Sequence, residues 1–269
     1  MLDERLGQLL PEAKIDADAF PVEIVVMDSR CDNRNASELF GEARGNSITA
    51  REILDAGAAR VEEELAELDP AEARHVVTVL RRRPGDVLEA LDGAGRTADL
   101  RVDEVRRHRV RVTVESVRQV PPPAGASVHL ALGVLHTSAM DWAVQKAVEV
   151  GASRFIPTCT ERAQIQLGTA RHRLRHWRRI ARQAIKQSHR PWQMEVPDPI
   201  SLEELITGAS HSRGSIADPQ GRPLGELEAP PPDLLVIGPE GGFGPHDREL
   251  LDRSQWHRIR LGEHVLRAE

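Results

Sequence analysis

The sequence predicts an α/β protein in which a small β-barrel precedes a larger domain built on a mostly parallel sheet. Three observations lead to this prediction. Short strands separated by tight turns occupy residues 87–117, three consecutive prolines follow at 121–123, and strands alternate with helices from about residue 128. Short strands joined by tight turns are typical of small barrels. Consecutive prolines favour an extended linker, and alternating strands and helices are typical of parallel sheets.

The bulk composition fits a water-soluble protein with ordinary hydrophobic cores. The chain has 269 residues, of which 40% are hydrophobic and 29% charged, enough for one large or two ordinary domains. No run approaches the roughly 18 apolar residues that span a bilayer, and residues 1–12 lack the pattern of a signal peptide. Cys31 and Cys159 match neither a disulfide framework nor a metal motif. We therefore expect a cytoplasmic protein with no membrane partner and no metal.

The charge is unevenly distributed along the chain. The net charge is −6, but residues 1–70 hold 17 acidic and 7 basic residues, which leaves 25 acidic and 29 basic residues in the rest. Within that part, residues 171–190 carry eight basic residues and no acidic one. Because a phosphate backbone responds to local charge, this run keeps nucleic acid among the candidate partners despite the negative total.

The first predicted domain spans residues 51–120. Residues 1–50 are acidic and poorly periodic, so we assign them no element and expect a disordered extension. A short helix is predicted at 71–82, and turns are predicted at 83–86 and 92–95. Strands are predicted at 87–91, 98–105 and 110–117, where Val110, Val112 and Val114 alternate with polar residues.

The second predicted domain spans residues 125–269. Strands are expected at 128–135, 155–157, 215–217, 234–238 and 258–261. Ser138 and Asp141 have the spacing of a capping box, and the helix that follows is expected to end at Gly151. A longer helix is predicted at 169–188. The expected buried residues of these two helices are Met140, Val144, Ala147, Val148, Leu174, Trp177, Ala181, Ala184 and Ile185.

The most informative segment runs from Leu234 to Gly244, where an apolar strand leads into a glycine-rich turn and a helix begins near Asp247. Glycines allow a ligand to approach the backbone, and free amides at a helix start bind polar ligand groups. Open α/β sheets bind ligands at their carboxyl edge. A tight turn without a ligand would look similar. The segment contains neither a phosphate-loop motif nor an early GxGxxG motif.

Several motifs, in order, resemble one family. The turn Ile237-Gly238-Pro239-Glu240-Gly241-Gly242, followed by Leu261-Gly262 and Val265-Leu266-Arg267, resembles the cofactor site of SPOUT methyltransferases. More closely, the chain resembles the ribosomal RNA small subunit methyltransferase E family, which methylates N3 of a uridine. Further matching motifs are His75 to Arg81, Pro84-Gly85-Asp86, Gln145-Lys146-Ala147, Thr160-Glu161-Arg162 and Trp177 to Ala181 with Gln187-Ser188. The resemblance covers about residues 52–269.

The resemblance implies a fold, a cofactor and partners. The fold would be a trefoil-knotted SPOUT domain preceded by a PUA-like RNA-binding barrel. The cofactor would be S-adenosylmethionine, the partners small-subunit (16S) ribosomal RNA and a second copy of the chain, and no metal is implied. The family's last helix would continue beyond Glu269, so the C-terminal helix looks truncated. The implied cofactor-binding residues are Asp218, Pro219, Ile237, Gly238, Pro239, Glu240, Gly241, Gly242, Leu261, Gly262 and Leu266.

Uridine-N3 methylation sets chemical requirements that suggest catalytic residues. A cation near the uracil carbonyls would stabilise the developing anion, and Arg267 or Arg162 could supply it. A carboxylate could accept the N3 proton, and the candidates are Glu240 and Glu269. For Arg162, an ion pair with Glu161 within the loop is an equally simple explanation. The segment 261–267 lacks a proline and an arginine of the family pattern, with Glu263 and His264 in their place.

The predicted RNA contacts lie mainly on the basic helix. Eight like charges without intervening acids would repel one another unless an anion is bound, so phosphate contacts are expected. A solvated helix face remains the alternative, for Lys146 as well. The predicted RNA-binding residues are Arg81, Lys146, Arg171, Arg175, Arg178, Arg179 and Arg182.

Two other hypotheses about function stay open at this point. The chain could be a SPOUT methyltransferase that acts on another RNA position, because a PUA-like domain indicates RNA without identifying it. It could also be a catalytically dead homologue that only binds RNA. Binding of S-adenosylmethionine separates the enzymes from the binding protein, and mapping of the methylated base separates the two enzymes.

Overall fold

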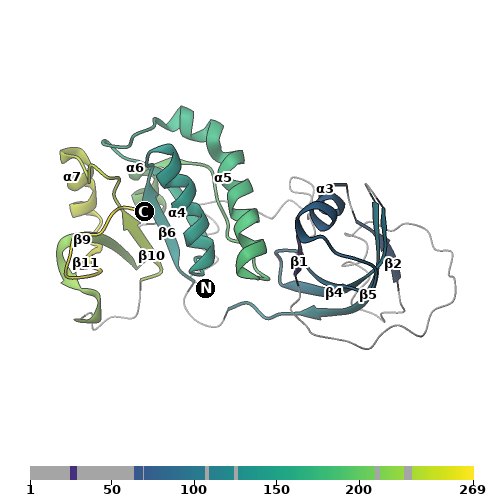
Figure 1. Ribbon diagram of the computed structural model, residues 1–269. Helices are drawn as coiled ribbons and strands as arrows, with labels where there is room; N and C mark the ends of the chain where they lie inside the picture. Colours follow the sequence, from purple (N-terminus) through teal and green to yellow (C-terminus); the bar gives the residue numbers. More distant parts are fainter. Residues whose placement is uncertain are drawn as a thin grey trace. The chain divides into compact units, whose positions relative to one another are not determined.

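The computed structural model describes residues 25–28, 64–68, 70–106, 109–123, 127–209, 213–226 and 232–269. The described chain divides into two compact units (Figure 1). The N-terminal unit contains the described residues up to 122 together with 185–192, and the C-terminal unit contains 123–184 and 193–269. The division falls inside the run of prolines at 121–123. In the described residues, no helix combines the length and the apolar character that crossing a membrane requires.

The N-terminal unit is built on a five-stranded antiparallel sheet with the order β1-β3-β4-β5-β2. The strands are β1 (Val25–Asp28), β2 (Glu64–Glu67), β3 (Val87–Leu91), β4 (Arg96–Arg106) and β5 (Arg109–Gln119). The predicted strands of this unit are confirmed. The sequence assigned no element to residues 1–50, but β1 lies within them and pairs with β3. A four-residue strand among acidic neighbours has too little periodicity to be recognised from sequence.

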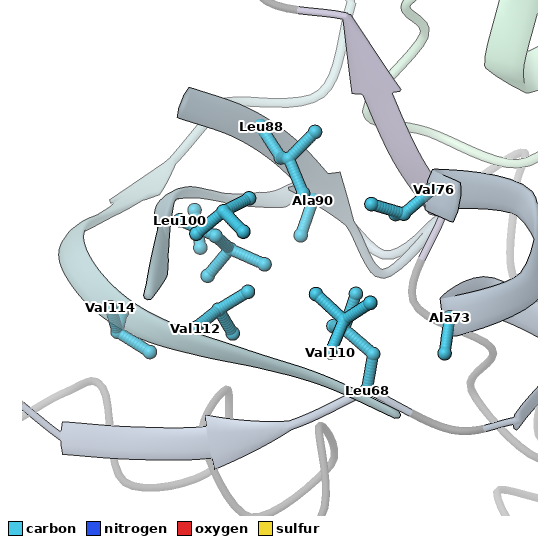
Figure 2. Close-up of a cluster of buried hydrophobic side chains, with 11 residues drawn as sticks. Leu68, Ala73, Val76, Leu88, Ala90, Leu100, Val110, Val112 and Val114 are labelled. Atoms are coloured by element: carbon cyan, nitrogen blue, oxygen red, sulfur yellow. The ribbon is translucent and has the colours of Figure 1, made fainter. Parts of the chain in front are cut away.

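The core of this unit follows from alternation along the strands. In β5, Val110, Val112 and Val114 are buried, whereas Arg109 and Arg111 are exposed. Successive side chains of a strand point to opposite faces, so the valines pack together and the arginines face solvent. Figure 2 shows the resulting cluster between the sheet and the helical segment. Its buried members are Leu68, Ala73, Val76, Leu88, Ala90, Ala98, Leu100, Val102, Val110, Val112 and Val114.

The helix predicted at 71–82 has a different form. An α-helix, α3 (Pro70–Arg74), continues as a wider π-helical segment, η1 (His75–Leu80), and the chain leaves it through Arg81 in the left-handed conformation at φ 51°. Three valines and a threonine make up most of η1, and β-branched residues are weak α-helix formers. Residues 185–192 also belong to this unit, where Lys186 Nζ lies 2.6 Å from Glu72 Oε1.

The C-terminal unit contains a six-stranded parallel sheet with the order β11-β9-β10-β6-β7-β8. The parallel sheet predicted from the strand–helix rhythm is therefore confirmed. Its strands are β6 (His129–Gly133), β7 (Arg154–Cys159), β8 (Ile200–Ser201), β9 (Gly214–Pro223), β10 (Leu234–Ile237) and β11 (His257–Arg260). Its helical segments are α4 (Thr137–Glu149), α5 (Leu167–Ser188), α6 (Leu202–Gly208), η2 (Leu224–Glu226) and α7 (Pro245–Arg253).

Helices cover both faces of this sheet. Residues of α6 and α7 form one buried cluster with Ala131, Ile156, Ile216 and Val236 from four strands. Because side chains alternate along a strand, the buried neighbours Leu132 and Phe155 face the opposite side. Helices α4 and α5 lie next to each other (Figure 1) and bury all nine residues predicted for them. Burial on both faces explains why these strands are nearly continuous apolar runs.

One detail predicted for α4 is wrong, and three short elements of this unit (β8, α6 and η2) were not predicted. Ser138 does not cap the helix, because α4 begins at Thr137 with His136 as its N-cap and no side-chain cap bond. The true capping box belongs to α6, where Ser201 and Glu204 exchange hydrogen bonds. Neither β8 nor α6 was predicted, since two residues and seven residues are too short for a clear periodic pattern.

Candidate functional site

A cavity of about 940 Å³ opens at the carboxyl edge of the parallel sheet. Three segments that are distant in sequence form its walls: the turn after β10, the segment after β11 and a bulge within β9. The strand order places β9 between β10 and β11, so the ends of β10 and β11 and the bulge of β9 converge there. Of the predicted cofactor-binding residues, the cavity is lined by Asp218, Pro219, Ile237, Gly238, Pro239, Glu240, Gly242, Leu261, Gly262 and Leu266.

The bulge in β9 forms one wall. Arg258 pairs with Ile216, whereas the next residue, Ile259, pairs with Arg222, so residues 217–221 leave the ladder. Gly221 ends the excursion against β11, where an added Cβ would lie 2.6 Å from the backbone of Arg258 and Ile259. Only glycine therefore allows the bulged strand to rejoin its neighbour at this point.

Asp218 is fixed at the tip of the bulge. Its Oδ1 accepts a hydrogen bond from Gln220 N at 2.9 Å, and its Oδ2 lies 2.6 Å from Arg258 Nη1. A second carboxylate, that of Asp252, lies 2.7 Å from Arg258 Nη2. Partial burial alone would raise the pKa of Asp218, but the hydrogen bonds from Gln220 and Arg258 outweigh it and hold the pKa below its ordinary value. Asp218 therefore presents a negative charge to the cavity.

The glycine-rich turn after β10 is held by close backbone packing. Gly242 has φ 67°, and its N–H donates to Pro239 O at 2.7 Å. On the neighbouring strand β6, a Cβ at Gly133 would lie 2.5 Å from Pro239 Cδ and 2.6 Å from Pro239 N. The turn can approach the end of β6 because residue 133 has no side chain. Its backbone and small residues thus border the cavity directly.

A set of carboxylate hydrogen bonds joins this turn to the loop after β7. Asp247 is 3% exposed, and its carboxylate accepts from Gly244 N at 3.0 Å and from Glu161 N at 3.0 and 3.1 Å. In return, Glu161 Oε2 accepts from His246 N at 3.0 Å. We call Glu161 and Asp247 the carboxylate clamp. It fixes the start of α7, and with it the end of the glycine-rich turn, relative to the loop at 160–162.

The four candidate catalytic residues divide into two groups. Glu240, Arg267 and Glu269 line the cavity. Arg162 does not; its Nη1 donates to Gly241 O at 2.9 Å. Gly241, the one predicted cofactor residue that does not line the cavity, thus contacts Arg162 instead. No ion pair joins Glu161 to Arg162 among the described residues, so both contribute to holding the turn.

Glu240 and Glu269 differ in their surroundings. Glu240 Oε1 accepts a hydrogen bond from His136 N at 3.2 Å, which ties the turn to the start of α4. Glu269 Oε1 lies 3.7 Å from Arg267 Nη1, and the Arg267 side chain is 89% exposed. Three apolar side chains of the cavity wall are also unusually open: Leu261, Val265 and Leu266. Apolar side chains left exposed around a cavity are typical of a binding site.

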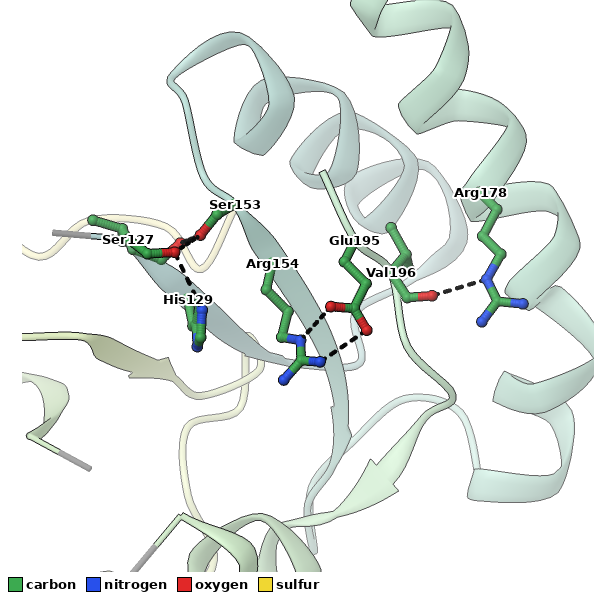
Figure 3. Close-up of polar contacts among 8 residues, drawn as sticks. Ser127, His129, Ser153, Arg154, Arg178, Glu195 and Val196 are labelled. Carbon is green, nitrogen blue, oxygen red and sulfur yellow. Dashed lines mark hydrogen bonds and ion pairs between the residues drawn. The ribbon is translucent and has the colours of Figure 1, made fainter. Parts of the chain in front are cut away.

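The predicted RNA-binding arginines of α5 form a stripe and a set of anchors. Arg171, Arg175 and Arg179 are exposed and spaced four residues apart, so they lie on one face of the helix. Arg178 points elsewhere: its Nε donates to Val196 O at 2.8 Å (Figure 3). Its Nη2 lies 3.3 Å from Asp198 Oδ1. Arg182 is half-buried. The sequence could not distinguish these two groups, because both carry the same charge.

The remaining predicted RNA contacts lie on other elements. Lys146 Nζ lies 2.6 Å from Glu149 Oε2 and 5.9 Å from the centre of the Trp142 ring. Arg81 is exposed at the end of η1, in the N-terminal unit. Figure 3 also shows the ion pair of Arg154 with Glu195, at 2.8 and 2.9 Å, close to the start of β7. This pair is at the amino edge of the sheet, opposite the cavity, and stabilises the fold.

Sequence reasoning missed part of the cavity wall. The additional lining residues are Ala217, Gln220, Phe243, Arg248, Arg258, Ile259, Arg260, His264, Val265 and Ala268. Most are direct neighbours of predicted residues, so a rule extending each segment by two positions would have found them. Arg248 and Arg258 required the three-dimensional fold, because they reach the cavity from α7 and β11. Among the described residues, no three His, Cys, Asp or Glu side chains are grouped to hold a metal ion.

Comparison with known proteins agrees with this geometry. A family model described as an RNA methyltransferase domain matches residues 122–269, and one described as an RNA methyltransferase PUA domain matches residues 68–115. The ribosomal RNA small subunit methyltransferase E of Mycobacterium bovis is 31% identical over 220 residues, which cover 76% of this chain and 81% of that relative.

Solved structures share the fold. A methyltransferase from Legionella pneumophila, solved in complex with the bound cofactor SAM, is 26% identical with a TM-score of 0.69, covering 84% of this chain and 93% of that one. A ribosomal RNA small subunit methyltransferase E from Neisseria gonorrhoeae, bound to S-adenosyl methionine, is 23% identical with a TM-score of 0.69. That match covers 79% of this chain and 89% of that one.

Proposed function

This chain belongs to the ribosomal RNA small subunit methyltransferase E family, and on that premise we propose that it methylates N3 of a uridine in small-subunit ribosomal RNA. It is an S-adenosylmethionine-dependent RNA methyltransferase with a SPOUT-type α/β fold and a PUA-like domain. The cavity at the carboxyl edge of the sheet is the proposed cofactor site. The observation that carries the proposal is the convergence of the glycine-rich turn and the segment after β11 on one cavity.

The residues of the cavity suit this cofactor. A volume of about 940 Å³ lies within the range of small-molecule sites, roughly 300–1,000 Å³. In this proposal backbone groups of the turn at 238–242 bind the polar edge of an adenine ring, apart from Gly242 N and the oxygens of Pro239 and Gly241, which are bonded within the protein. Ile237, Leu261 and Leu266 offer apolar surface for its faces. Asp218 offers a carboxylate for hydroxyl or ammonium groups.

The reaction forms a bond between N3 of uracil and a methyl carbon, while the bond between that carbon and sulfur breaks and the N3 proton leaves. The bound cofactor supplies the electrophilic methyl group on a positively charged sulfur. The protein's part is chiefly to align N3 with the methyl group, because in-line transfer depends on geometry. A target base in RNA must first leave its stack, which costs a few kcal/mol, and least where the RNA is single-stranded.

We assign the electrostatic roles to residues of the cavity wall. Arg267 stabilises the negative charge that develops on the uracil carbonyl oxygens. Glu240 or Glu269 accepts the N3 proton. Arg162 acts indirectly, because its guanidinium is committed to Gly241 O and so supports the turn. The exposed stripe of Arg171, Arg175 and Arg179 binds RNA phosphates, together with Arg81 on the N-terminal unit.

We also propose that the chain acts as a homodimer, as its resemblance to SPOUT enzymes implies. The exposed apolar side chains Trp142 on α4 and Val265 beside the cavity support this proposal. Light scattering at micromolar concentration tests it. A homodimer has twice the 29.8 kDa mass of one chain, and a mass of one chain would refute the proposal.

The function is tested with small-subunit RNA from a strain that lacks the modification. The RNA is incubated with the protein and methyl-labelled S-adenosylmethionine, digested to nucleosides and analysed by mass spectrometry. We expect 3-methyluridine to be the labelled nucleoside. A label on another base or on a ribose would refute the N3 assignment. Binding of the cofactor without any transfer to RNA would refute the proposed activity.

A further inference from the structure

The charge of the cavity wall does not match a site for the cofactor alone. At neutral pH S-adenosylmethionine carries a net positive charge, because its sulfonium and ammonium groups outweigh its carboxylate. Yet four arginines line the cavity: Arg248, Arg258, Arg260 and Arg267. Lining carboxylates are fewer, namely Asp218, Glu240 and Glu269. Cations do not favour the binding of a cation, so some of these arginines must serve another ligand.

Two of the four arginines are neutralised within the protein. Arg258 contacts Asp218 at 2.6 Å and Asp252 at 2.7 Å, so two carboxylates surround its guanidinium. Arg267 has Glu269 at 3.7 Å. Among the residues that the structure describes, the guanidinium groups of Arg248 and Arg260 make neither an ion pair nor a side-chain hydrogen bond. Each adds to the cavity wall a positive charge that no ion pair among the described residues neutralises.

The position of these two side chains places the charge beside the reacting segments. Arg260 is the last residue of β11 and directly precedes Leu261 and Gly262. Arg248 is exposed in the first turns of α7, which follows the glycine-rich turn. Arg248 and Asp218 both line the cavity, and the charge of Arg248 contributes to lowering the pKa of the Asp218 carboxyl. Near the N-terminus of a helix, the helix dipole also favours an anion and disfavours an unpaired cation.

We infer that Arg248 and Arg260 form a phosphate-binding site for the RNA backbone next to the target nucleotide. This inference rests on the proposed function and adds to it a site that orients the substrate. The phosphodiester of RNA carries one negative charge and several acceptor oxygens, which guanidinium groups bind with paired hydrogen bonds. A base that is turned out of its stack moves its own phosphates toward the cavity mouth. Cations there hold the nucleotide in position for transfer.

The test compares Arg248→Gln, Arg260→Gln and the double variant with the unaltered full chain. RNA binding is measured by fluorescence anisotropy without cofactor over a range of salt concentrations, and cofactor binding by calorimetry without RNA. We expect each single variant to weaken RNA binding roughly tenfold and to reduce the slope of log K against log salt by about one. The dissociation constant for S-adenosylmethionine should change less than twofold.

Arg253→Gln is the matched control, because Arg253 is on the same helix, is 75% exposed and does not line the cavity. It should leave RNA affinity within about twofold. Weaker cofactor binding by the Arg248 or Arg260 variants, with RNA affinity retained, would overturn the inference and assign the pair to the cofactor's carboxylate. An equal loss for Arg253→Gln would also overturn it. The RNA-binding readout needs no methyl transfer, so absence of 3-methyluridine in the activity assay refutes the proposed function separately.

Discussion

Replacing Asp247 with alanine removes the centre of the carboxylate clamp. Asp247 is 3% exposed, and its carboxylate accepts hydrogen bonds from two backbone amides, Gly244 N and Glu161 N. An alanine side chain cannot accept either bond. The clamp connects the start of α7 to the loop after β7, so its loss affects both stability and the shape of the glycine-rich turn.

The magnitude follows from the two amides that lose their acceptor. A buried donor left without a partner costs about 1–3 kcal/mol. The Gly244 amide is buried and carries the full cost, whereas the partly buried Glu161 amide can recover a bond to water. We therefore expect Asp247→Ala to lower the free energy of unfolding of the C-terminal unit by about 3 kcal/mol.

Urea unfolding followed by tryptophan fluorescence measures this change, because Trp177 and Trp256 lie in the core of the same unit. Glu249→Ala is the control, since Glu249 is on the same helix, is 68% exposed and, in the described part of the chain, has only Arg253 as an ion-pair partner, at 3.9 Å. The control should change the free energy of unfolding by less than about 0.5 kcal/mol. A loss below about 0.5 kcal/mol for Asp247→Ala as well would refute the role of the clamp.

Three further predictions concern the turn, the basic stripe and the cysteine. Gly133→Ala places a Cβ against Pro239 and should slow methyl transfer roughly a hundredfold by displacing the turn. The control is Gly168→Ala, whose added Cβ enters open space and should leave the rate of methyl transfer unchanged. Equal rates for the two variants would contradict this account. Changing Arg171, Arg175 and Arg179 together to glutamate should lower the slope of log K for RNA binding against log salt concentration by about two to three, measured by fluorescence anisotropy. An unchanged slope would mean that the stripe is a solvated helix face that does not bind RNA. Burial raises the pKa of the Cys159 thiol to about 11, so the thiol stays protonated at pH 8. The thiol should react with iodoacetamide much more slowly in the folded protein than in urea. Because the folded-state pKa is raised, the protonated thiol contributes to the free energy of unfolding below its ordinary pKa, and this contribution should be lost as the pH rises toward 11. Peptide mapping that shows equal rates at Cys159 would contradict the burial.

Long periodic segments allowed most of the fold to be predicted. The apolar spacing of α4 and α5 identified all nine buried positions, and alternation in β5 identified the valines of the N-terminal core. Short elements were missed because two to seven residues give no period, as in β8 and α6. The bulge at 217–221 was also missed, since it depends on the pairing of β9 with β11 and not on local preference.

The parts of the candidate site where a ligand would approach the backbone could be predicted from the sequence. The glycines of the turn after β10 indicated close approach of a ligand, and Gly238 and Gly242 line the cavity whereas Gly241 does not. Gly262, which the family resemblance implied, also lines it. The roles of the arginines were harder to predict from sequence. An arginine side chain is long and can extend in several directions, and the fold determines which groups its guanidinium contacts. Arg162 donates to Gly241 O and Arg178 to Val196 O, whereas the sequence offered Arg162 as a catalytic cation or a loop ion pair and Arg178 as an RNA contact or part of a solvated face. No sequence motif pointed to Arg248, and only the structure shows that it lines the cavity.

A crystal structure of the protein with S-adenosylmethionine would test the central claim most directly. We predict electron density for the cofactor in the cavity, with its adenine against the backbone at 238–242 and the segment at 261–266, and with Asp218 facing the ribose or the amino acid end. Density at any other place on the molecule, or a cavity without cofactor at saturating concentration, would contradict the account.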